Sequence, residues 1–136
     1  RTGVQVACPE PRAVQYVAVR ASGDLVGAGS ATAWAWKGNA VVATLSGHAY
    51  TICCLAAHSH DDNTFVTGGV DFTARVWGIA TESCTAVLRH DNVVTTVGFL
   101  SDGTTVSGSR DRTVKLWAPD GTCTSTFRHK MAVTHV

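Results

Sequence analysis

The sequence has little of what helices are built from. Among 136 residues there are 2 Glu and 3 Lys, and no stretch of about ten residues combines helical spacing of apolar side chains with helix caps. Long charged side chains normally fill helix surfaces and a βαβ unit needs a crossover helix, so helical bundles and βαβ folds are excluded. The abundant residues are 19 Val and 18 Thr, whose branched side chains favour strands. The composition predicts an all-β domain, long enough to bury its own core.

Strong net charge and long apolar runs are also absent. The formal net charge is +1 and the Lys and Arg residues form no run, so we expect neither nucleic acid nor an anionic membrane as a partner. No apolar stretch approaches the roughly 18 residues of a membrane-spanning helix, and the first residues lack the charged and apolar regions of a secretory signal. We therefore expect no membrane association.

The five cysteines lack the features of a disulfide framework or a zinc motif. Their number is odd, no pair has CxxC spacing, and most lie within apolar runs. These properties favour buried, reduced thiols and predict an intracellular, cytoplasmic location. The first residue is not Met, and we expect the chain to be a processed product or an excerpt of a longer one.

What the sequence does contain is an internal repeat with a period near 40 residues. Three tryptophans are 41 and 40 residues apart, and three histidines are 42 and 39 residues apart. Two unrelated markers keep one period, which is the signature of repeated structural units. The markers are Trp36, Trp77, Trp117, His48, His90 and His129.

Alignment on the tryptophans superposes two of the copies closely. The segment FVTGGVDFTARVW (65–77) matches TVSGSRDRTVKLW (105–117) in its Val, Gly, Asp, Thr and Trp positions and pairs Thr67 with Ser107. The earlier segment LVGAGSATAWAW (25–36) is one residue shorter and has no Asp, so it is a degraded copy.

Each copy divides into four short segments separated by turn residues, which predicts consecutive antiparallel strands. In the third copy we predict strands over 93–99, 104–108, 113–118 and 122–127. The turns between them read SDG (101–103), RDR (110–112) and PDG (119–121), where Asp supplies side-chain hydrogen bonds and Gly supplies positive φ.

The period, the four strands, the His-bearing loop LSGHAYTI (45–52) and the terminal Asp and Trp of each copy resemble the WD40 repeat, whose units are the blades of a β-propeller. The sequence departs from the family in two respects. Gly78 and Ala118 stand where the Asp of the Trp-Asp pair is usual, and Arg89 and Arg128 replace the Gly before His.

The resemblance implies one partial WD40 propeller over 1–136. Its parts are a divergent blade at 8–47, blades at 48–89 and 90–128, and the first strand of a further blade at 129–136. A stray strand near 3–7 and a lone strand at 132–136 flank these blades. About three four-stranded blades do not close a ring, so we expect the remaining blades to come from the same chain or from another subunit.

The repeated polar residues allow two interpretations. His90, Ser107 and Asp111 have the residue types of a nucleophilic triad, which is the basis of a hydrolase hypothesis. The same set recurs one period earlier and ends each time on Trp, whereas an active site needs one constellation in one cleft. We therefore expect structural hydrogen bonds from the indole N–H through hydroxyl and His to Asp, as in the WD40 tetrad. The predicted tetrads are His48, Thr67, Asp71 and Trp77, and His90, Ser107, Asp111 and Trp117.

The contact residues are implied by position in the WD40 family, just after the His loops and just before the tetrad Asp. Their small and apolar character favours protein surfaces over nucleic acid or sugar. Arg110 and Arg112 flank Asp111 in a turn and should project from a blade end, as solvated residues, as partner contacts or as a phosphate or nucleic-acid contact. The predicted protein-binding residues are Thr51, Cys53, Val70, Val93, Thr95 and Arg110.

Two further features have alternative interpretations. The stretch from Cys53 to Asp62 holds metal-ligand side chains, but adjacent strand residues point to opposite faces, so Cys53 and Cys54 cannot meet one ion and a polar loop over 58–62 is the favoured interpretation. Trp34 is either core fill or an exposed anchor for a partner. We expect no metal site and no cofactor.

The sequence thus predicts a non-catalytic WD40 interaction scaffold, a subunit or adaptor of a multiprotein complex that binds other proteins. The alternative is a hydrolase that uses the His/Ser/Asp set, or a metal-dependent enzyme that uses Cys54, His58 and His60.

Overall fold

The structure is a computed structural model that describes residues 14–134. It contains twelve strands, which form three four-stranded antiparallel sheets. Each sheet is a meander of strands that are consecutive in the sequence, as the predicted all-β repeat requires. The part of the chain described here has no helix long and apolar enough to cross a membrane.

The three sheets are called blades 1, 2 and 3. Blade 1 contains β1 (Tyr16–Val19), β2 (Leu25–Gly29), β3 (Thr32–Lys37) and β4 (Ala40–Ser46). Blade 2 contains β5 (Ile52–Ala57), β6 (Thr64–Gly69), β7 (Thr73–Gly78) and β8 (Ser83–Arg89). Blade 3 contains β9 (Val94–Phe99), β10 (Thr105–Ser109), β11 (Thr113–Trp117) and β12 (Cys123–Arg128).

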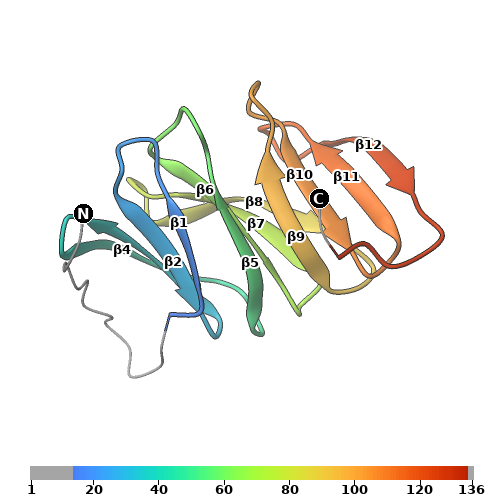
Figure 1. The fold of residues 1–136 in the computed structure, drawn as a ribbon, viewed down its shortest axis with the longest axis horizontal. Coiled ribbons are helices and arrows are strands. Elements are labelled where there is room, and N and C mark those ends of the chain that lie inside the picture. The colour runs from blue at the N-terminus through green and yellow to red at the C-terminus, as the bar shows by residue number, and fades with distance from the viewer. Residues whose placement is uncertain (1–13, 135–136) are drawn as a thin grey trace.

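The blades stand side by side along the long axis of the molecule and do not close a ring (Figure 1). Their first strands are neighbours, because β5 contacts both β1 and β9. The meander gives each blade two ends. The loops between blades and the turn between second and third strands lie at one end, which we call the interblade end. The other two hairpins lie at the opposite end, which we call the hairpin end.

The strands of blade 3 lie within one residue of the predicted ones. The turn chemistry explains this agreement, because Gly103 and Gly121 have φ of +89° and +90°, and Asp102 accepts a hydrogen bond from the N–H of Thr104 at 2.9 Å. The two strands predicted outside the three blades are not found in the described residues. The strand near 3–7 lies outside the described residues, and residues 132–134, the described part of the predicted 132–136 strand, form no strand.

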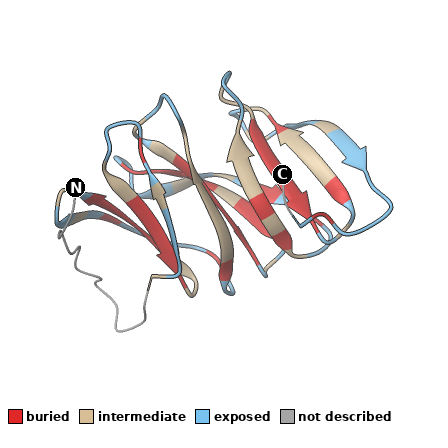
Figure 2. Ribbon diagram, in the orientation of Figure 1, coloured by how far each residue is buried: buried red, intermediate tan, exposed pale blue. Residues whose placement is uncertain are grey.

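The hydrophobic core consists of two layers, each between two blades. The first layer joins blades 1 and 2 and includes Leu45, Phe65 and Trp77, and the second joins blades 2 and 3 and includes Val66 and Trp117. The second strands β6 and β10 are buried along nearly their whole length, whereas the outer strand β12 is mostly exposed (Figure 2). Full burial of a side chain such as Phe65 contributes roughly 1.5–3 kcal/mol.

Every blade has an irregularity at the same place. The pairing of the third with the fourth strand shifts register just before the repeated Trp, so one residue of the fourth strand bulges out. In blades 2 and 3 the bulged residue is Thr85 or Thr124, whose hydroxyl donates to the backbone carbonyl of Val76 or Leu116 at 3.2 and 3.3 Å. The bulge is thus a repeated structural feature that the alignment of the copies within the sequence did not predict.

A buried arginine joins the hairpin ends of blades 1 and 2. Arg20 is 8% exposed, and its guanidinium donates to the backbone carbonyl of Trp36 at 2.6 Å. It also donates to a carboxylate oxygen and to the backbone carbonyl of Asp62, both at 3.0 Å. The other carboxylate oxygen of Asp62 accepts from the N–H of Ser22. Arg20 therefore connects two blades through hydrogen bonds to Asp62, which is 42 residues away in the sequence.

Replacement of Arg20 by Leu should lower the free energy of unfolding by about 1–3 kcal/mol, because it removes the hydrogen bonds that the guanidinium donates to the Trp36 carbonyl and to Asp62. Urea unfolding measures this change. Lys37→Leu is the control, since Lys37 is exposed at the same end, and a loss of similar size in both variants would contradict the role of Arg20.

Candidate functional site

The predicted tetrad residues of blade 3 lie in one hydrogen-bonded chain. Trp117 Nε1 donates to Ser107 Oγ at 2.8 Å, and that oxygen lies 2.6 Å from His90 Nε2. His90 Nδ1 lies 2.8 Å from a carboxylate oxygen of Asp111. The same oxygen accepts from the N–H of Asp91 at 3.0 Å. The chain therefore ties β11, β10, the loop after β8 and the β10–β11 turn together.

Blade 2 repeats this arrangement. Trp77 Nε1 donates to Thr67 Oγ1 at 2.8 Å, and Thr67 Oγ1 lies 2.6 Å from His48 Nε2. His48 Nδ1 lies 2.9 Å from Asp71, whose carboxylate also accepts from the N–H of Ala49. The hydroxyl has one hydrogen, so it donates to Nε2 while it accepts from the indole, and the imidazole is neutral with its hydrogen on Nδ1.

Burial and hydrogen bonding set the charge states of the tetrad. Burial lowers the pKa of His90 below 6.5 and outweighs the opposing influence of Asp111. Burial alone would raise the pKa of Asp111, but hydrogen bonds from Thr113, from the Asp91 N–H and from His90 hold it well below 3.8. His48 and Asp71 are shifted in the same directions. Both tetrads therefore pair a neutral His with an ionised Asp at neutral pH.

The arrangement has the hydrogen-bond pattern of a Ser/His/Asp triad but not its accessibility. The hydroxyl of Ser107 faces His90 Nε2, as a nucleophile would face its general base. Ser107 is 0% exposed, as is the side chain of His90, and the hydroxyl oxygen already accepts the indole N–H. A nucleophile must be open to a substrate carbonyl, so this chemistry is blocked in both blades.

Blade 1 differs from blades 2 and 3 at the position of the tetrad hydroxyl. Gly27 stands where blades 2 and 3 have Thr67 and Ser107, and a Cβ at Gly27 would lie 2.9 Å from Trp36 Cζ3. The Trp36 ring therefore occupies the space that the hydroxyl side chain takes in the other blades.

The predicted contact residues form two backbone-linked pairs at the interblade end. In blade 2 the N–H of Val70 donates to the carbonyl of Thr51 at 2.9 Å, and in blade 3 the N–H of Arg110 donates to the carbonyl of Val93 at 3.0 Å. Thr51, Val70 and Arg110 are exposed, whereas Val93 is half-buried. Each pair holds the start of a first strand against the turn before a tetrad Asp.

The two remaining contact candidates lie at the junction of blades 2 and 3. Cys53 is half-buried, and burial raises the pKa of its thiol while the nearby positive charge of Arg110 opposes the rise. The hydroxyl of Thr95 is engaged within the fold, because it donates to the carbonyls of Gly108 and Val133. Arg110 therefore lies close to both blades. Thr95 binds the segment that follows blade 3.

The side chains considered for a metal site are held in separate surroundings. Cys54 packs toward blade 3 with its thiol 3.8 Å from the Val94 carbonyl, and burial raises its pKa to about 12. His58 Nδ1 accepts from the N–H groups of His60 and Asp61, which shapes the β5–β6 turn. Among residues 14–134 no group of three or more His, Cys, Asp or Glu side chains is placed to hold a metal ion.

Trp34 fills the core and is not an exposed anchor. It is 1% exposed, and its ring lies 6.4 Å from that of Trp36. Its indole nitrogen is buried without a hydrogen-bond partner among the described residues. Of the two interpretations of Trp34, core fill is the one that this burial supports.

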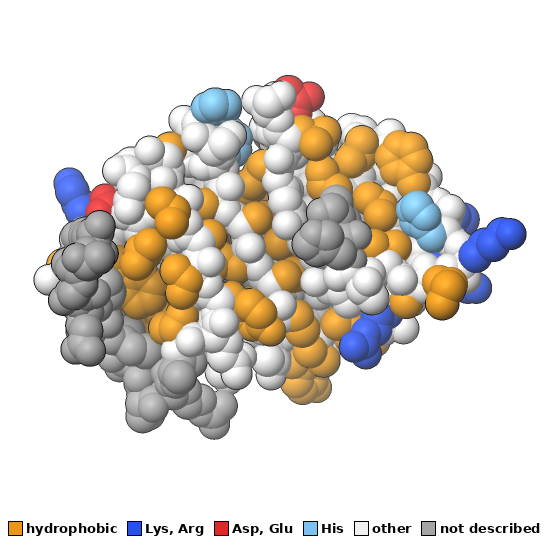
Figure 3. All heavy atoms as spheres, viewed as in Figure 1, with side chains coloured by type: hydrophobic (Ala, Val, Ile, Leu, Met, Phe, Trp, Pro, Cys, Tyr) orange, Lys and Arg blue, Asp and Glu red, His pale blue; other side chains and the backbone are white. Residues whose placement is uncertain are grey.

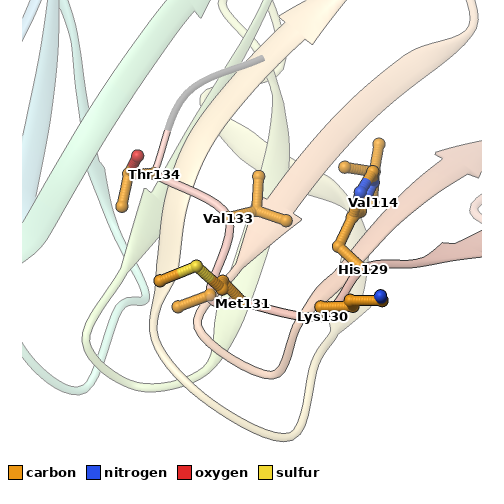
Figure 4. A pocket seen from close by; sticks show the side chains of 7 residues that line it. Val114, His129, Lys130, Met131, Val133 and Thr134 are labelled. Atoms are coloured by element: carbon orange, nitrogen blue, oxygen red, sulfur yellow. The ribbon is translucent and has the colours of Figure 1, made fainter.

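Two hollows lie beside blade 3. One, of about 500 Å³, lies between Val114 and residues 129–134, which leave β12 and cross the interblade end of blade 3 (Figure 4). Val133 is held there because its N–H donates to the Ser109 carbonyl at 3.0 Å. The other, of about 240 Å³, lies at the hairpin end of blades 2 and 3, where the His58 ring lies 5.0 Å from that of Phe99.

The sheets, the repeated tetrads and the loop positions define a repeat protein built from propeller blades. The family described as "WD domain, G-beta repeat" matches residues 39–78 and 82–118, together more than half of the chain. The chain therefore belongs to the WD40 repeat family. Each matched segment holds the last strand of one sheet and the first three of the next, so the sequence repeat is offset by one strand from the blade.

Proteins of known name that resemble the chain are distant from it. It is 32% identical over 113 residues to Mitochondrial division protein 1 of Kluyveromyces lactis, which covers 72% of this chain and 16% of that protein. It is 36% identical over 89 residues to Protein Notchless of Drosophila melanogaster, 61% of this chain and 18% of the relative. It is 28% identical over 89 residues to Coatomer subunit beta'-2 of Arabidopsis thaliana, 62% and 10%. The chain spans less than a fifth of each of these relatives.

Removal of the tetrad carboxylate should destabilise the fold. We expect Asp111→Ala to lower the free energy of unfolding by about 1–3 kcal/mol, because His90, Thr113 and the Asp91 N–H lose their acceptor. Asp91→Ala is the matched control, since its exposed side chain has no hydrogen bond to residues 14–134. Unfolding in urea reports both. Unchanged stability together with a lost hydrolytic activity would overturn the structural interpretation.

Stability should fall as the pH is lowered from neutral. Because the pKa of His90 is lower in the folded state than the unfolded value of 6.5, the unfolded chain binds protons first, and the free energy of unfolding declines as the pH falls below that value. A second decline follows below 3.8, where protonation of Asp111 and Asp71 favours the unfolded chain. Urea unfolding at a series of pH values measures the slope, which should be smaller in His90→Gln. A stability independent of pH between about 5 and 7 would contradict this.

Proposed function

We propose that the chain is part of a non-catalytic protein-interaction scaffold, as WD40 repeat proteins typically are, and acts as a subunit or adaptor of a multiprotein complex. The remaining blades of its propeller come from the same protein or from another subunit. The cysteines at 53, 54, 84 and 123 are free thiols, which supports a reducing, cytoplasmic location.

One observation carries the non-catalytic part of this proposal. The only hydroxyl, imidazole and carboxylate groups of residues 14–134 that line up as a nucleophilic triad occur twice, and in both blades the hydroxyl is buried and accepts a tryptophan N–H. The polar side chains that a hydrolase would use are thereby engaged in hydrogen bonds that stabilise the blades. Partner binding therefore depends on the exposed residues that these tetrads position.

The face that the tetrads position lies at the interblade end of blades 2 and 3. Thr51 and Val70 are exposed in blade 2, and Arg110 is exposed in blade 3 and lies near Cys53. Short turns on a rigid sheet keep these side chains in place without a partner, which lowers the entropy lost on binding. A small apolar patch with one arginine suits a protein surface.

Quantitative affinity capture from cells tests the proposal. Arg110→Glu and Val70→Arg should each remove the same partner proteins while the melting temperature stays unchanged, because both side chains are exposed at this face. Lys37→Glu and Thr44→Arg are the matched controls for charge and size, since both residues are exposed in blade 1.

Retention of every partner by Arg110→Glu and Val70→Arg would refute the contact face. Ester or peptide hydrolysis by the purified chain that Ser107→Ala abolishes would refute the non-catalytic assignment.

A further inference from the structure

Besides Arg110, five cations that are scattered in the sequence gather at the interblade end of blades 2 and 3. Lys115 Nζ donates to the backbone carbonyl of Arg89 at 3.4 Å, and the carbonyl of Arg112 accepts from the N–H of His129 at 2.8 Å. Arg128 is paired across the sheet with Thr113, the residue after Arg112. The group, which we call the basic rim, consists of Arg89, Arg112, Lys115, Arg128 and Lys130.

No acid of the described chain neutralises the basic rim. The ion pairs within residues 14–134 involve Arg20, His48 and His90 and none of the five rim residues. The nearby carboxylates of Asp71 and Asp111 are committed to the tetrads, which leaves Asp91 as the exposed acid at this end. The rim therefore carries an unbalanced positive charge.

The acids gather at the opposite end of the blades. In a chain of net charge +1 this separation places unlike charges at the two ends. Most of the Lys and Arg side chains visible in Figure 3 lie over blade 3, and the acids lie away from them. The acids of the hairpin end are Asp24, Asp61, Asp62, Glu82, Asp102 and Asp120.

The rim side chains are presented in a partly fixed arrangement. Arg112 has a φ of +71° as the last residue of the β10–β11 turn, so the turn geometry sets where its side chain leaves the blade. Lys115 lies 5.6 Å from the centre of the Trp117 ring and is held there by its hydrogen bond to Arg89. Arg89, Arg112 and Arg128 are exposed. Planar guanidinium groups bind carboxylates through paired hydrogen bonds, and several close together favour a ligand with several carboxylates.

We propose that the basic rim binds an acidic segment of a partner protein, one with clustered Asp and Glu residues. This inference rests on the proposed scaffold function and names a second contact surface, since the rim shares no residue with the face of Thr51, Val70 and Arg110. A polyanion such as nucleic acid suits the molecule less well, because the acidic hairpin end and the low net charge reduce long-range attraction.

Fluorescence anisotropy with a labelled Glu-rich peptide of about eight residues tests the rim, with a peptide in which every Glu is replaced by Gln as the control ligand. We expect binding of the Glu peptide alone, and weaker binding as salt is raised from about 0.05 to about 0.5 M. Arg128→Glu should weaken binding about fivefold to tenfold. Arg112→Gly removes a charge while it keeps the positive φ, and should weaken binding about threefold.

Lys37→Glu is the matched charge reversal away from the rim and should leave the affinity within about twofold. Equal binding of the Glu and Gln peptides, an equal loss in Lys37→Glu, or tighter binding of a single-stranded oligonucleotide or of phosphatidylserine vesicles would overturn the proposal. Val70→Arg separates the two surfaces. If it loses its partners while the Glu peptide fails to bind the wild type, the rim is refuted and the scaffold function stands.

Discussion

In blades 2 and 3 the hydroxyl oxygen of Thr67 or Ser107 is the atom on which the rest of the blade depends. It accepts from a tryptophan of the third strand and donates to a histidine of the preceding loop, and the histidine donates in turn to the aspartate of a turn. Four segments are thus joined by three hydrogen bonds in a buried setting where each is difficult to replace by water. The positions of the loop before each of these two blades and of the turn that carries its Asp follow from this chain.

Local signals explain why much of the fold could be predicted from the sequence. Turn residues such as Gly103 and Asp102 act within a few positions, so the strands of blade 3 were located to within one residue. The tetrads were identifiable because two markers repeat with one period. The bulges at Thr85 and Thr124 gave no such signal, since a Thr in a strand is ordinary and the shift in register appears only when two strands are paired.

Features that join distant segments were not predictable in this way. Arg20 meets Asp62 across 42 residues, and the five residues of the basic rim come from three separate stretches of the sequence, so neither forms a pattern along the chain. The sequence suggested one basic turn around Arg110 and Arg112, whereas the structure adds Arg89, Arg128 and Lys130 to its surroundings. Thr95 was predicted as a partner contact from its position in the repeat. In the structure its hydroxyl donates a hydrogen bond to the Val133 carbonyl, so it is already engaged within the chain.

Blade 1 differs from blades 2 and 3 in the polar interactions that stabilise it. Gly27 stands in the place of the tetrad hydroxyl residue, and the buried guanidinium of Arg20 donates a hydrogen bond to Asp62 of blade 2. In a solenoid-like array each unit draws its stability from its own structure and from its interface with a neighbour. The bonds of Arg20 and the shared apolar layer strengthen the interface between blades 1 and 2. We therefore expect the amide hydrogens of blade 1 to exchange with solvent in the same opening event as those of blade 2, as in a single cooperative unit.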